Sequence, residues 1–343
     1  MLVGLVAGRE RLELREFPEP TPAPGKAVVQ IAYCGICGTD VHAYQSGQAY
    51  NPAICGHEWC GTVSAVGRDV DVREGDRVAI GVAGACGRCP TCRRGDHEHC
   101  ETAFAGMIGV GPMAAPHGGF ASAIAIDAAR LYRTHDRIDD LDAALLEPAT
   151  VALHAVRRTP IRLGDCVVVI GAGPIGLLVM QCARAAGAGA TILIEPQPGR
   201  RALAGELGAD LLIDPNAEDP AQAIAAFTGR AGADVIFECA GIAATIEIAV
   251  GLSRRGGVVS LVGVPASASE INGAAWLVKE VRLVTSLGYT REEFDITQAL
   301  VTDGRLRLRP LHSDTVALEQ LPEAFARLAR APADIKILVQ PGR

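Results

Sequence analysis

Two different hydrophobic patterns divide the chain near residue 160. Before that point, short stretches alternate apolar and polar positions and are separated by glycines, as in Lys26–Tyr33, Gly61–Gly67 and Arg77–Ile80. Such alternation is typical of β-strands with one buried face. After residue 160, short apolar runs alternate with alanine-rich stretches of helical period. We therefore expect a β-rich first domain and, in the second half, β–α units that form a doubly wound parallel sheet.

The second half can be divided into elements from this pattern alone. The expected strands are Cys166–Ile170, Thr191–Ile194, Leu211–Ile213, Asp234–Phe237, Val258–Val262 and Arg282–Thr285. The expected helices between them are Pro174–Ala186, Arg200–Leu207, Ala221–Phe227 and Ile242–Leu252. Beyond residue 286 the alternation weakens, and two helices (Arg291–Thr302 and Leu321–Ala329) and a strand (Ile335–Val339) are predicted to return to the first domain. The predicted domains are residues 1–150 with 287–343, and residues 151–286.

Composition and charge exclude several classes of partner. The net charge of −7 and an aromatic content of 4% argue against nucleic acids and anionic membranes, which favour basic faces. The longest uncharged run, Cys166–Ala183, contains three glycines and a proline, so we interpret it as a strand, loop and helix rather than a membrane span. No targeting segment is visible, and we expect a cytoplasmic protein. Eleven cysteines in such a chain should be reduced, and clustered ones should bind metal.

Four cysteines follow one another at spacings typical of a metal site. Cys86, Cys89, Cys92 and Cys100 lie in a loop at about residues 84–102 that is rich in glycine and arginine. Two-residue gaps let a tight turn direct successive thiolates at one centre, and the fourth thiolate completes a tetrahedron around zinc. Because four sulfurs leave no open position, this zinc is expected to be structural. Free cysteines or an iron–sulfur cluster are the alternatives.

A second group of ligand types suggests a metal site with an open position. The segment CGICGTDVH (residues 34–42) follows an expected strand, His57 and Glu58 come fifteen residues later, and Glu147 lies further on. One thiolate, one imidazole and one carboxylate leave a fourth position for water or substrate. Spacing alone leaves alternatives open, because Cys34 and Cys37 could instead form a redox dithiol and the His–Glu pair could be a surface feature.

A glycine-rich turn predicts a dinucleotide site. Gly171, Gly173 and Gly176 follow the strand Cys166–Ile170 directly and open an alanine-rich helix. In that context the glycines allow a tight turn, close approach of a pyrophosphate and packing of helix on strand. The phosphates would lie at the helix N-terminus, where free N–H groups favour anions.

The acidic residue Glu195 predicts NAD rather than NADP. It ends the second strand, where a carboxylate can accept hydrogen bonds from both adenosine ribose hydroxyls and repels a 2′-phosphate. Arg200 and Arg201 follow closely and could bind that phosphate, so NADP remains the alternative.

Taken together, these motifs resemble the zinc-dependent medium-chain dehydrogenases, of the alcohol, sorbitol, threonine and butanediol dehydrogenase type. The resemblance covers essentially the whole chain and rests on CGICGTDVH, GHEWCGTVSAVG, GDRV, the four-cysteine lobe, LLEPATVALHAV and VVVIGAGPIG in this order. It implies a GroES-like catalytic domain joined to a Rossmann domain, two zinc ions per chain and a homo-oligomer, either dimer or tetramer.

The resemblance also implies roles for individual residues. Cys37 and His57 would bind the catalytic zinc, Glu58 would be a ligand or near ligand, and Glu147 would bind directly or through water. Asp40 would orient the zinc histidine, and Thr39 and His42 would relay the proton of the alcohol to solvent. The expected cofactor residues are Gly171, Gly173, Pro174, Ile175, Gly176, Glu195, Arg200, Val262, Gly263, Val264, Ser286 and Leu287.

The expected reaction is hydride transfer between a secondary alcohol and NAD. By resemblance, the carboxylate-bearing zinc site favours polyols, diols, cyclitols or amino alcohols, each oxidised to its ketone. Three alternatives are an NADP-preferring sugar dehydrogenase, a non-catalytic protein that binds zinc and NAD as a sensor, and a dithiol redox enzyme that uses Cys34 and Cys37.

Overall fold

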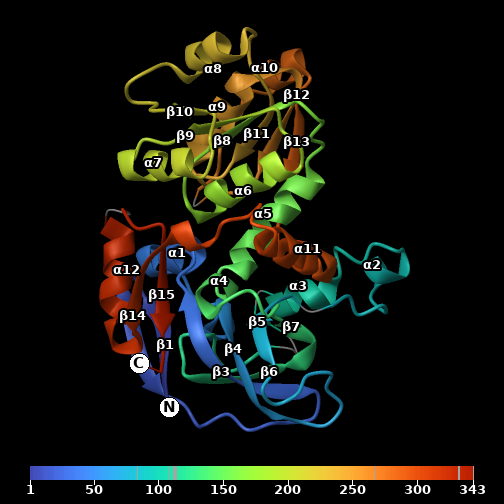
Figure 1. Cartoon of the computed structure of the whole chain (residues 1–343), viewed down its shortest axis with the longest axis vertical. Coiled ribbons are helices and arrows are strands. Elements are labelled where there is room, and N and C mark those ends of the chain that lie inside the picture. The colour runs from blue at the N-terminus through green and yellow to red at the C-terminus, as the bar shows by residue number, and fades with distance from the viewer. Residues whose placement is uncertain (83, 108, 111–113, 266, 331–332, 343) are drawn as a thin grey trace. The chain divides into compact units, whose positions relative to one another are not determined.

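The chain folds into two compact units, each of which combines distant parts of the sequence. The structure, a computed structural model, describes residues 1–82, 84–107, 109–110, 114–265, 267–330 and 333–342. One unit comprises residues 1–147, 288–302 and 311–343, and the other comprises residues 148–287 and 303–310. Figure 1 shows the course of the chain through both.

The first unit is built on a mixed, mainly antiparallel sheet. Its strand order is β14–β15–β3–β4–β5–β7, with β6 paired to β3 as well. The strands are β3 (Lys26–Gly35), β4 (Glu58–Val66), β5 (Arg77–Ile80), β6 (Ala123–Asp127), β7 (Leu131–Arg133), β14 (His312–Ala317) and β15 (Lys336–Gln340). A separate hairpin pairs β1 (Leu2–Gly8) with β2 (Arg11–Glu16).

The helices of this unit cover the sheet and carry its loops. They are α1 (Gly38–Ser46), α2 (Pro90–Arg93), α3 (Glu101–Met107), α4 (Asp140–Ala143), α11 (Arg291–Thr302) and α12 (Leu321–Arg330), and α5 (Leu146–Arg158) continues into the second unit. The core joins Val29 and Ile31 of β3 to Trp59, Phe120 and Phe325, all nearly inaccessible to solvent. Burying such side chains is the main favourable term in the folding of this unit.

The second unit is a parallel sheet of the doubly wound kind. Within its described residues the strand order is β10–β9–β8–β11–β12–β13, and every pair is parallel. The strands are β8 (Cys166–Ile170), β9 (Ala190–Ile194), β10 (Leu211–Ile213), β11 (Ala233–Glu238), β12 (Ser253–Leu261) and β13 (Arg282–Thr285). The doubly wound sheet predicted from the sequence is therefore confirmed.

Crossover helices cover both faces of this sheet. They are α6 (Pro174–Ala185), α7 (Pro198–Glu206), α8 (Pro220–Thr228), α9 (Ala243–Leu252) and α10 (Gly273–Lys279). The strand order reverses its direction at β8, and right-handed crossovers therefore place α6 and α7 on one face and α9 and α10 on the other (Figure 1). Strands buried on both faces explain the continuous apolar runs seen in the sequence.

The predicted elements agree closely with the observed ones, except where polar residues hide the pattern. Strand β12 begins at Ser253, five residues before the predicted start, because Arg254 to Gly257 break its apolar run. Helices α1 to α5 and α10 and strands β1, β2, β6, β7 and β14 were not predicted.

The division into units differs from the predicted domains in one segment. The predicted boundaries were near 150 and 286, and the observed ones lie at 147/148 and 287/288. Residues 303–310, predicted to belong with the first domain, pack with the second unit instead. The reason is a pair of hydrogen bonds in which Gln181 accepts from the Arg307 backbone at 2.8 Å and donates to the Arg307 carbonyl at 3.3 Å.

Candidate metal and dinucleotide sites

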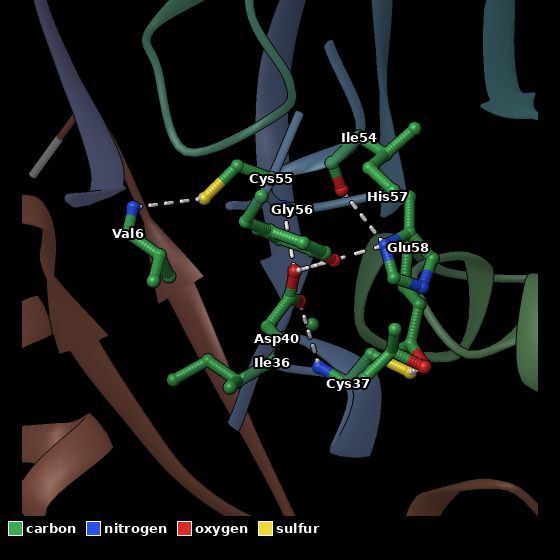
Figure 2. A network of polar contacts seen from close by, with 12 residues as sticks. Val6, Ile36, Cys37, Asp40, Ile54, Cys55, Gly56, His57 and Glu58 are labelled. Carbon is green, nitrogen blue, oxygen red and sulfur yellow. Dashed lines mark hydrogen bonds and ion pairs between the residues drawn. The ribbon is translucent and has the colours of Figure 1, made fainter. Parts of the chain in front are cut away.

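A buried aspartate holds together the two loops that carry the metal-ligand types. Cys37 lies between the end of β3 and the first residue of α1, and Asp40 is in the first turn of that helix, fully buried. The Asp40 carboxylate accepts hydrogen bonds from Cys37 N (3.1 Å), Tyr50 Oη (2.6 Å) and Gly56 N (3.3 Å) (Figure 2). Burial raises the pKa of Asp40, although these donors and His57 act in the opposite direction.

The imidazole of His57 is oriented by a carbonyl group. Its Nδ1 lies 2.9 Å from the Ile54 carbonyl oxygen and 3.8 Å from Asp40 Oδ1. Figure 2 shows the ring between these two groups. The hydrogen bond to Ile54 therefore fixes the ring, and Asp40 acts on His57 through its charge and through the backbone of Gly56. With Nδ1 engaged as donor, Nε2 is the nitrogen free to bind a metal.

Three ligand atoms of different chemistry converge beside this network. The Cys37 sulfur, a His57 ring nitrogen and a Glu58 carboxylate oxygen all lie within 4.8 Å of one another. Sulfur, nitrogen and oxygen donors at this separation suit a tetrahedral zinc ion with one position left open. The residues present therefore fit the metal that the sequence predicted.

Glu58 is held in place by a buried lysine. Lys336 Nζ lies 2.5 Å from Glu58 Oε2 and donates to the Ile36 carbonyl at 3.0 Å, and both charged side chains are only 2% exposed. Strand β15 pairs with β3, which pairs with β4, and this register brings Lys336 against Glu58. A Cβ atom at position 35 would lie 2.5 Å from Glu58 Oε2, so any residue larger than Gly35 would displace the Glu58 carboxylate from its present place.

Glu147 lies near the convergent three but outside their cluster. It lies in the first turn of α5 and is half-buried, and its carboxylate is not among the atoms within 4.8 Å of one another. Burial and the charge of Glu58 raise its pKa to about 7, against the opposing effects of His57, Lys336 and Arg130. Of the two acids predicted from the sequence, the structure brings Glu58 into the cluster and leaves Glu147 beside it.

The predicted relay residues share helix α1. The Cys37 thiol donates to Thr39 Oγ1 over 3.7 Å, and both Thr39 and His42 are exposed. A spacing of three residues places their side chains on the same face of the helix. Cys34, by contrast, is fully buried, and burial raises its pKa well above the usual range of a thiol. That environment does not suit the thiol exchange of a redox dithiol.

The four-cysteine loop brings its sulfurs together. The four sulfur atoms lie within 4.8 Å of one another. Backbone N–H groups of Cys86, Cys89 and Cys92 point at the sulfurs of Cys100, Cys86 and Cys89, over 3.3, 3.3 and 3.4 Å. Hydrogen bonds from the Arg88 and Cys89 backbone lower the pKa of Cys86 to about 6, which favours the thiolate that zinc binds. The loop histidines, His97 and His99, are exposed.

The predicted cofactor residues gather along one edge of the parallel sheet. They follow the carboxyl ends of four strands: Gly171–Gly176 after β8, Glu195 after β9, Val262–Val264 after β12, and Ser286 and Leu287 after β13. Parallel strands end at the same edge, and this edge is where doubly wound sheets bind dinucleotides. The buried hydroxyl of Ser286 finds no hydrogen-bond partner among the described residues, so a polar group remains available to a ligand.

The three glycines of the turn have distinct steric environments. Gly171 has a φ of +98°, and a Cβ at Gly176 would lie 1.9 Å from the Gly171 carbonyl oxygen. A Cβ at Gly173 would meet no atom within 4 Å, so the space beside it is open. Gly173 precedes α6, whose first N–H groups face that space, and this arrangement fits a pyrophosphate.

The acid at the end of β9 is firmly positioned. Glu195 is 5% exposed, and its carboxylate accepts hydrogen bonds from Ala172 N (2.8 Å) and Gln197 N (2.9 Å). Arg201, which could have bound a 2′-phosphate, donates instead to the Glu195 carbonyl and pairs with Asp214 at 2.9 Å.

Sequence reasoning missed three residues that organise these sites. Lys336 and Tyr50 hold Glu58 and Asp40, and Glu238 accepts hydrogen bonds from Ala240 N and Gly241 N in the loop after β11. A signal existed for Lys336, because a lysine inside the apolar strand predicted at 335–339 needs a buried acidic partner. Nothing in the sequence identifies the partner.

Comparison with known proteins agrees with this geometry. Residues 23–136 match the alcohol dehydrogenase GroES-like domain, and residues 174–302 match the zinc-binding dehydrogenase family. The chain is 31% identical to 2-dehydro-3-deoxy-L-galactonate 5-dehydrogenase of Pseudoalteromonas atlantica, with 99% of this chain and 98% of that protein covered.

Solved structures extend the likeness to the whole fold. The crystal structure of 2R,3R-butanediol dehydrogenase from Bacillus subtilis has a TM-score of 0.86 at 30% identity, over 99% of each chain. A chain described as a zinc-binding dehydrogenase from Sinorhizobium meliloti 1021, bound to NADP, has a TM-score of 0.86 at 31% identity over 99% of each chain. A third structure, named as a short chain alcohol dehydrogenase from Escherichia coli CFT073 in complex with NADH, has a TM-score of 0.85 at 25% identity, over 99% of each chain.

Removing Lys336 should be far more costly than removing an exposed cation. We expect Lys336→Met to lower the free energy of unfolding by about 3–5 kcal/mol, because it leaves the buried Glu58 carboxylate without a counter-ion. The double variant Lys336→Met/Glu58→Gln should lose much less free energy of unfolding than the sum of the losses in the two single variants. Urea-induced unfolding measures both. The control is Arg305→Met, which removes an exposed pair with Asp303 and should cost about 0–1 kcal/mol. Equal effects of Lys336→Met and Arg305→Met would contradict this account.

Two glycine substitutions should separate cofactor binding from folding. Gly173→Ala places a methyl group in open space, so stability should change by about 1 kcal/mol or less, while NADH affinity should fall about tenfold. Gly176→Ala forces a methyl group against the Gly171 carbonyl and should lower stability by about 1–3 kcal/mol. Thermal unfolding and NADH fluorescence titration distinguish the two effects. Unchanged NADH affinity in Gly173→Ala would remove the turn from the cofactor site.

Proposed function

The chain belongs to the zinc-dependent alcohol dehydrogenases, and from that premise we propose that Cys37, His57 and Glu58 hold the zinc ion at which a secondary alcohol is oxidised by NAD. The chain is an oxidoreductase of this zinc-binding type and takes a small-molecule alcohol or ketone as substrate. The convergence of three different ligand atoms within 4.8 Å is the observation that carries the proposal.

Each residue of the site has a separate task. When bound, zinc would act as a Lewis acid that makes the alcohol hydroxyl more acidic, and the nicotinamide would accept the hydride from the carbinol carbon. The Lys336 ammonium holds Glu58 Oε2, which leaves the other carboxylate oxygen for the metal. The Asp40 carboxylate holds Cys37 in place by accepting from its backbone N–H. The Ile54 carbonyl orients the His57 ring through Nδ1. Glu147, which lies outside this cluster, would replace Glu58 at the metal or hold a water there.

The alcohol proton leaves along helix α1. The Thr39 hydroxyl, next to Cys37, would take the proton, and exposed His42 on the same helix face would pass it to solvent. The overall reaction balances as a secondary alcohol and NAD⁺ giving a ketone, NADH and one proton.

NAD is the proposed cofactor, and NADP the alternative. A carboxylate anchored at the end of β9 accepts ribose hydroxyls and repels a 2′-phosphate, and Arg201 is already engaged by Asp214. The remaining predicted residues, Gly171 to Gly176, Arg200, Val262 to Val264, Ser286 and Leu287, would bind the rest of the dinucleotide. Cys86, Cys89, Cys92 and Cys100 would hold a second, structural zinc, which makes two per chain.

None of the eleven cysteines, all of which are described, forms a disulfide bond, and this supports a reducing compartment such as the cytoplasm. None of the helices in the described part of the chain is long and apolar enough to cross a bilayer.

We also propose that the chain forms a homo-oligomer through the β13 edge of the second unit. Strand β13 has a neighbour on one side only among the described residues, and Leu283 in it is 43% exposed. Leu277 and Val278 of α10, the helix that precedes β13, are 80% and 64% exposed. An uncovered sheet edge beside apolar side chains favours association with a second copy.

Alcohol-dependent NADH formation should depend on Cys37 and tolerate loss of Cys34. Cys37→Ala should remove one of two zinc ions and lower kcat at least 100-fold, because the metal loses a ligand. Cys34→Ser should keep both metal and turnover, since Cys34 is only packed in the core. Spectrophotometry across diols, polyols and amino alcohols, together with elemental analysis, measures both. Full turnover in Cys37→Ala, or thiol exchange without NAD, would contradict the proposal.

A charge on the apolar edge should change the oligomeric state. Leu277→Lys is expected to shift the protein toward the monomer in light scattering coupled to size exclusion, because a lysine would be buried in the contact. Leu163→Lys is the control, because Leu163 is 91% exposed and lies outside α10 and β13. A monomeric wild type would contradict the proposal outright.

A further inference from the structure

The last residue of β11 is a buried acid at the sheet edge where the predicted cofactor residues gather. Glu238 is 1% exposed, and it lies opposite Ile170 of β8 on one side and Leu261 of β12 on the other. The loops that follow these two neighbouring strands carry Gly171–Gly176 and Val262–Val264. A carboxylate that is removed from water needs donors around it, and the loops at this edge supply them.

One oxygen of the Glu238 carboxylate holds the loop between β11 and α9. Oε1 accepts hydrogen bonds from Ala240 N at 2.9 Å, Gly241 N at 3.0 Å and Thr245 Oγ1 at 2.7 Å. The first two donors belong to the loop itself, and the third lies in the first turn of α9. Three donors on one charged oxygen offset its burial and fix the course of the loop.

The main chain of the same residue holds the loop after β12. The Glu238 carbonyl oxygen accepts from Val262 N at 3.0 Å and from Gly263 N at 2.9 Å. A Cβ atom at position 263 would lie 2.4 Å from Gly241 N and 3.0 Å from Glu238 Oε2. The loops after β11 and β12 therefore meet backbone to backbone, with the second carboxylate oxygen beside the contact.

The glycine turn after β8 rests against the same loop. Gly171 has a φ of +98°, and a Cβ atom there would lie 3.0 Å from both the N and the Cα of Ala240. Directly before this contact, Cys239 N donates to the Ile170 carbonyl at 2.9 Å. Three loops of the cofactor edge thus meet at Ala240 and Gly241, the two residues whose N–H groups Glu238 engages.

The position of Glu238 in the sheet relates it to one half of a dinucleotide. The proposed partner of the adenosine ribose, Glu195, follows β9. In a doubly wound sheet the dinucleotide extends across the point where the strand order reverses, which is β8 in this unit. The nicotinamide half therefore belongs to the strands on the other side of β8, and these are β11 and β12.

We propose that Glu238 is a positioning residue for the nicotinamide half of the dinucleotide, and that it acts by holding together the loops after β11 and β12. This inference rests on the proposed dinucleotide site and adds a residue that the predicted cofactor set lacks. The backbone hydrogen bonds of Glu238 do not depend on its side chain. Loss of the carboxylate should therefore loosen the loop after β11 while the strands stay paired.

The test compares a ligand that fills both halves of the site with one that fills only the adenosine half. On the zinc-loaded protein, NADH binding is measured by fluorescence titration, and AMP binding by displacement of NADH. We expect Glu238→Ala to weaken NADH binding about 10–100-fold, because three hydrogen bonds to a charged group are lost. AMP binding should weaken less than about threefold, since the loops at β8 and β9 keep their own contacts.

Two variants control this experiment. Glu238→Gln retains an acceptor oxygen for the loop, so it should restore most of the NADH affinity. Asp234→Asn changes another buried acid of the same strand, one that accepts from Cys166 N at 2.8 Å and Arg254 Nε at 2.7 Å near the amino end of β11. It should lower the temperature of unfolding and leave the ratio of NADH to AMP affinity unaltered.

Several outcomes would overturn the inference. An unchanged ratio in folded Glu238→Ala, or equal weakening of NADH and AMP, would assign Glu238 to the stability of the second unit alone. Glu238→Gln that binds NADH as weakly as Glu238→Ala would contradict the role of the Oε1 hydrogen bonds.

A milder variant covers the case in which Glu238→Ala does not fold. Thr245→Val removes one of the three donors and should lower the NADH to AMP affinity ratio about threefold, so an unchanged ratio would contradict the inference. A wild type that binds neither NADH nor AMP would overturn the proposed dinucleotide site itself. That result is distinct from a wild type that binds both and a Glu238→Ala variant that does the same.

Discussion

The buried ion pair between Lys336 and Glu58 is the interaction on which the metal cluster depends. It joins residues 278 positions apart, and both charges are almost completely removed from water. The attraction between two such charges offsets the free-energy cost of removing them from water only while they stay in contact. The C-terminal strand therefore completes the first unit and also fixes Glu58 beside Cys37 and His57, the three residues proposed to bind the metal. A chain that lacked β15 would have its cysteine and histidine but no means of holding Glu58.

The discontinuous first unit follows from the same arrangement. Its segments 1–147, 288–302 and 311–343 are separated in the sequence by the two segments of the second unit. Within the first unit, Lys336 links neighbouring strands, and Asp40 links neighbouring loops in a similar way. Its single carboxylate accepts hydrogen bonds from Cys37, Tyr50 and Gly56. Asp40 and Glu58, two buried acids that each accept from their own donors, thus position the sulfur, nitrogen and oxygen atoms of the proposed metal site.

In the second unit, the course of the backbone rather than a buried ion pair brings the candidate binding residues together. A parallel sheet brings the ends of its strands to one edge, so residues from four distant loops can bind a single extended ligand. Gly173 at this edge leaves open space where a side chain could otherwise stand, and the carboxylates of Glu195 and Glu238 hold the loops by accepting hydrogen bonds from backbone N–H groups. This division of tasks suits an enzyme in which one unit supplies the chemistry and the other holds the cofactor.

Features that depend only on neighbours along the chain could be predicted from the amino-acid sequence. The apolar runs of the parallel strands, the turn at Gly171–Gly176 and the four cysteines at 86–100 each lie within one element or loop, where spacing dictates geometry. The three-dimensional fold was needed to bring Glu58, and not Glu147, within 4.8 Å of Cys37 and His57, and to pair Lys336 with Glu58. It also placed residues 303–310 with the second unit and left Arg130 without an ion pair among the described residues. These contacts depend on which strands pair and in which register, and registers between distant segments leave no trace in local spacing.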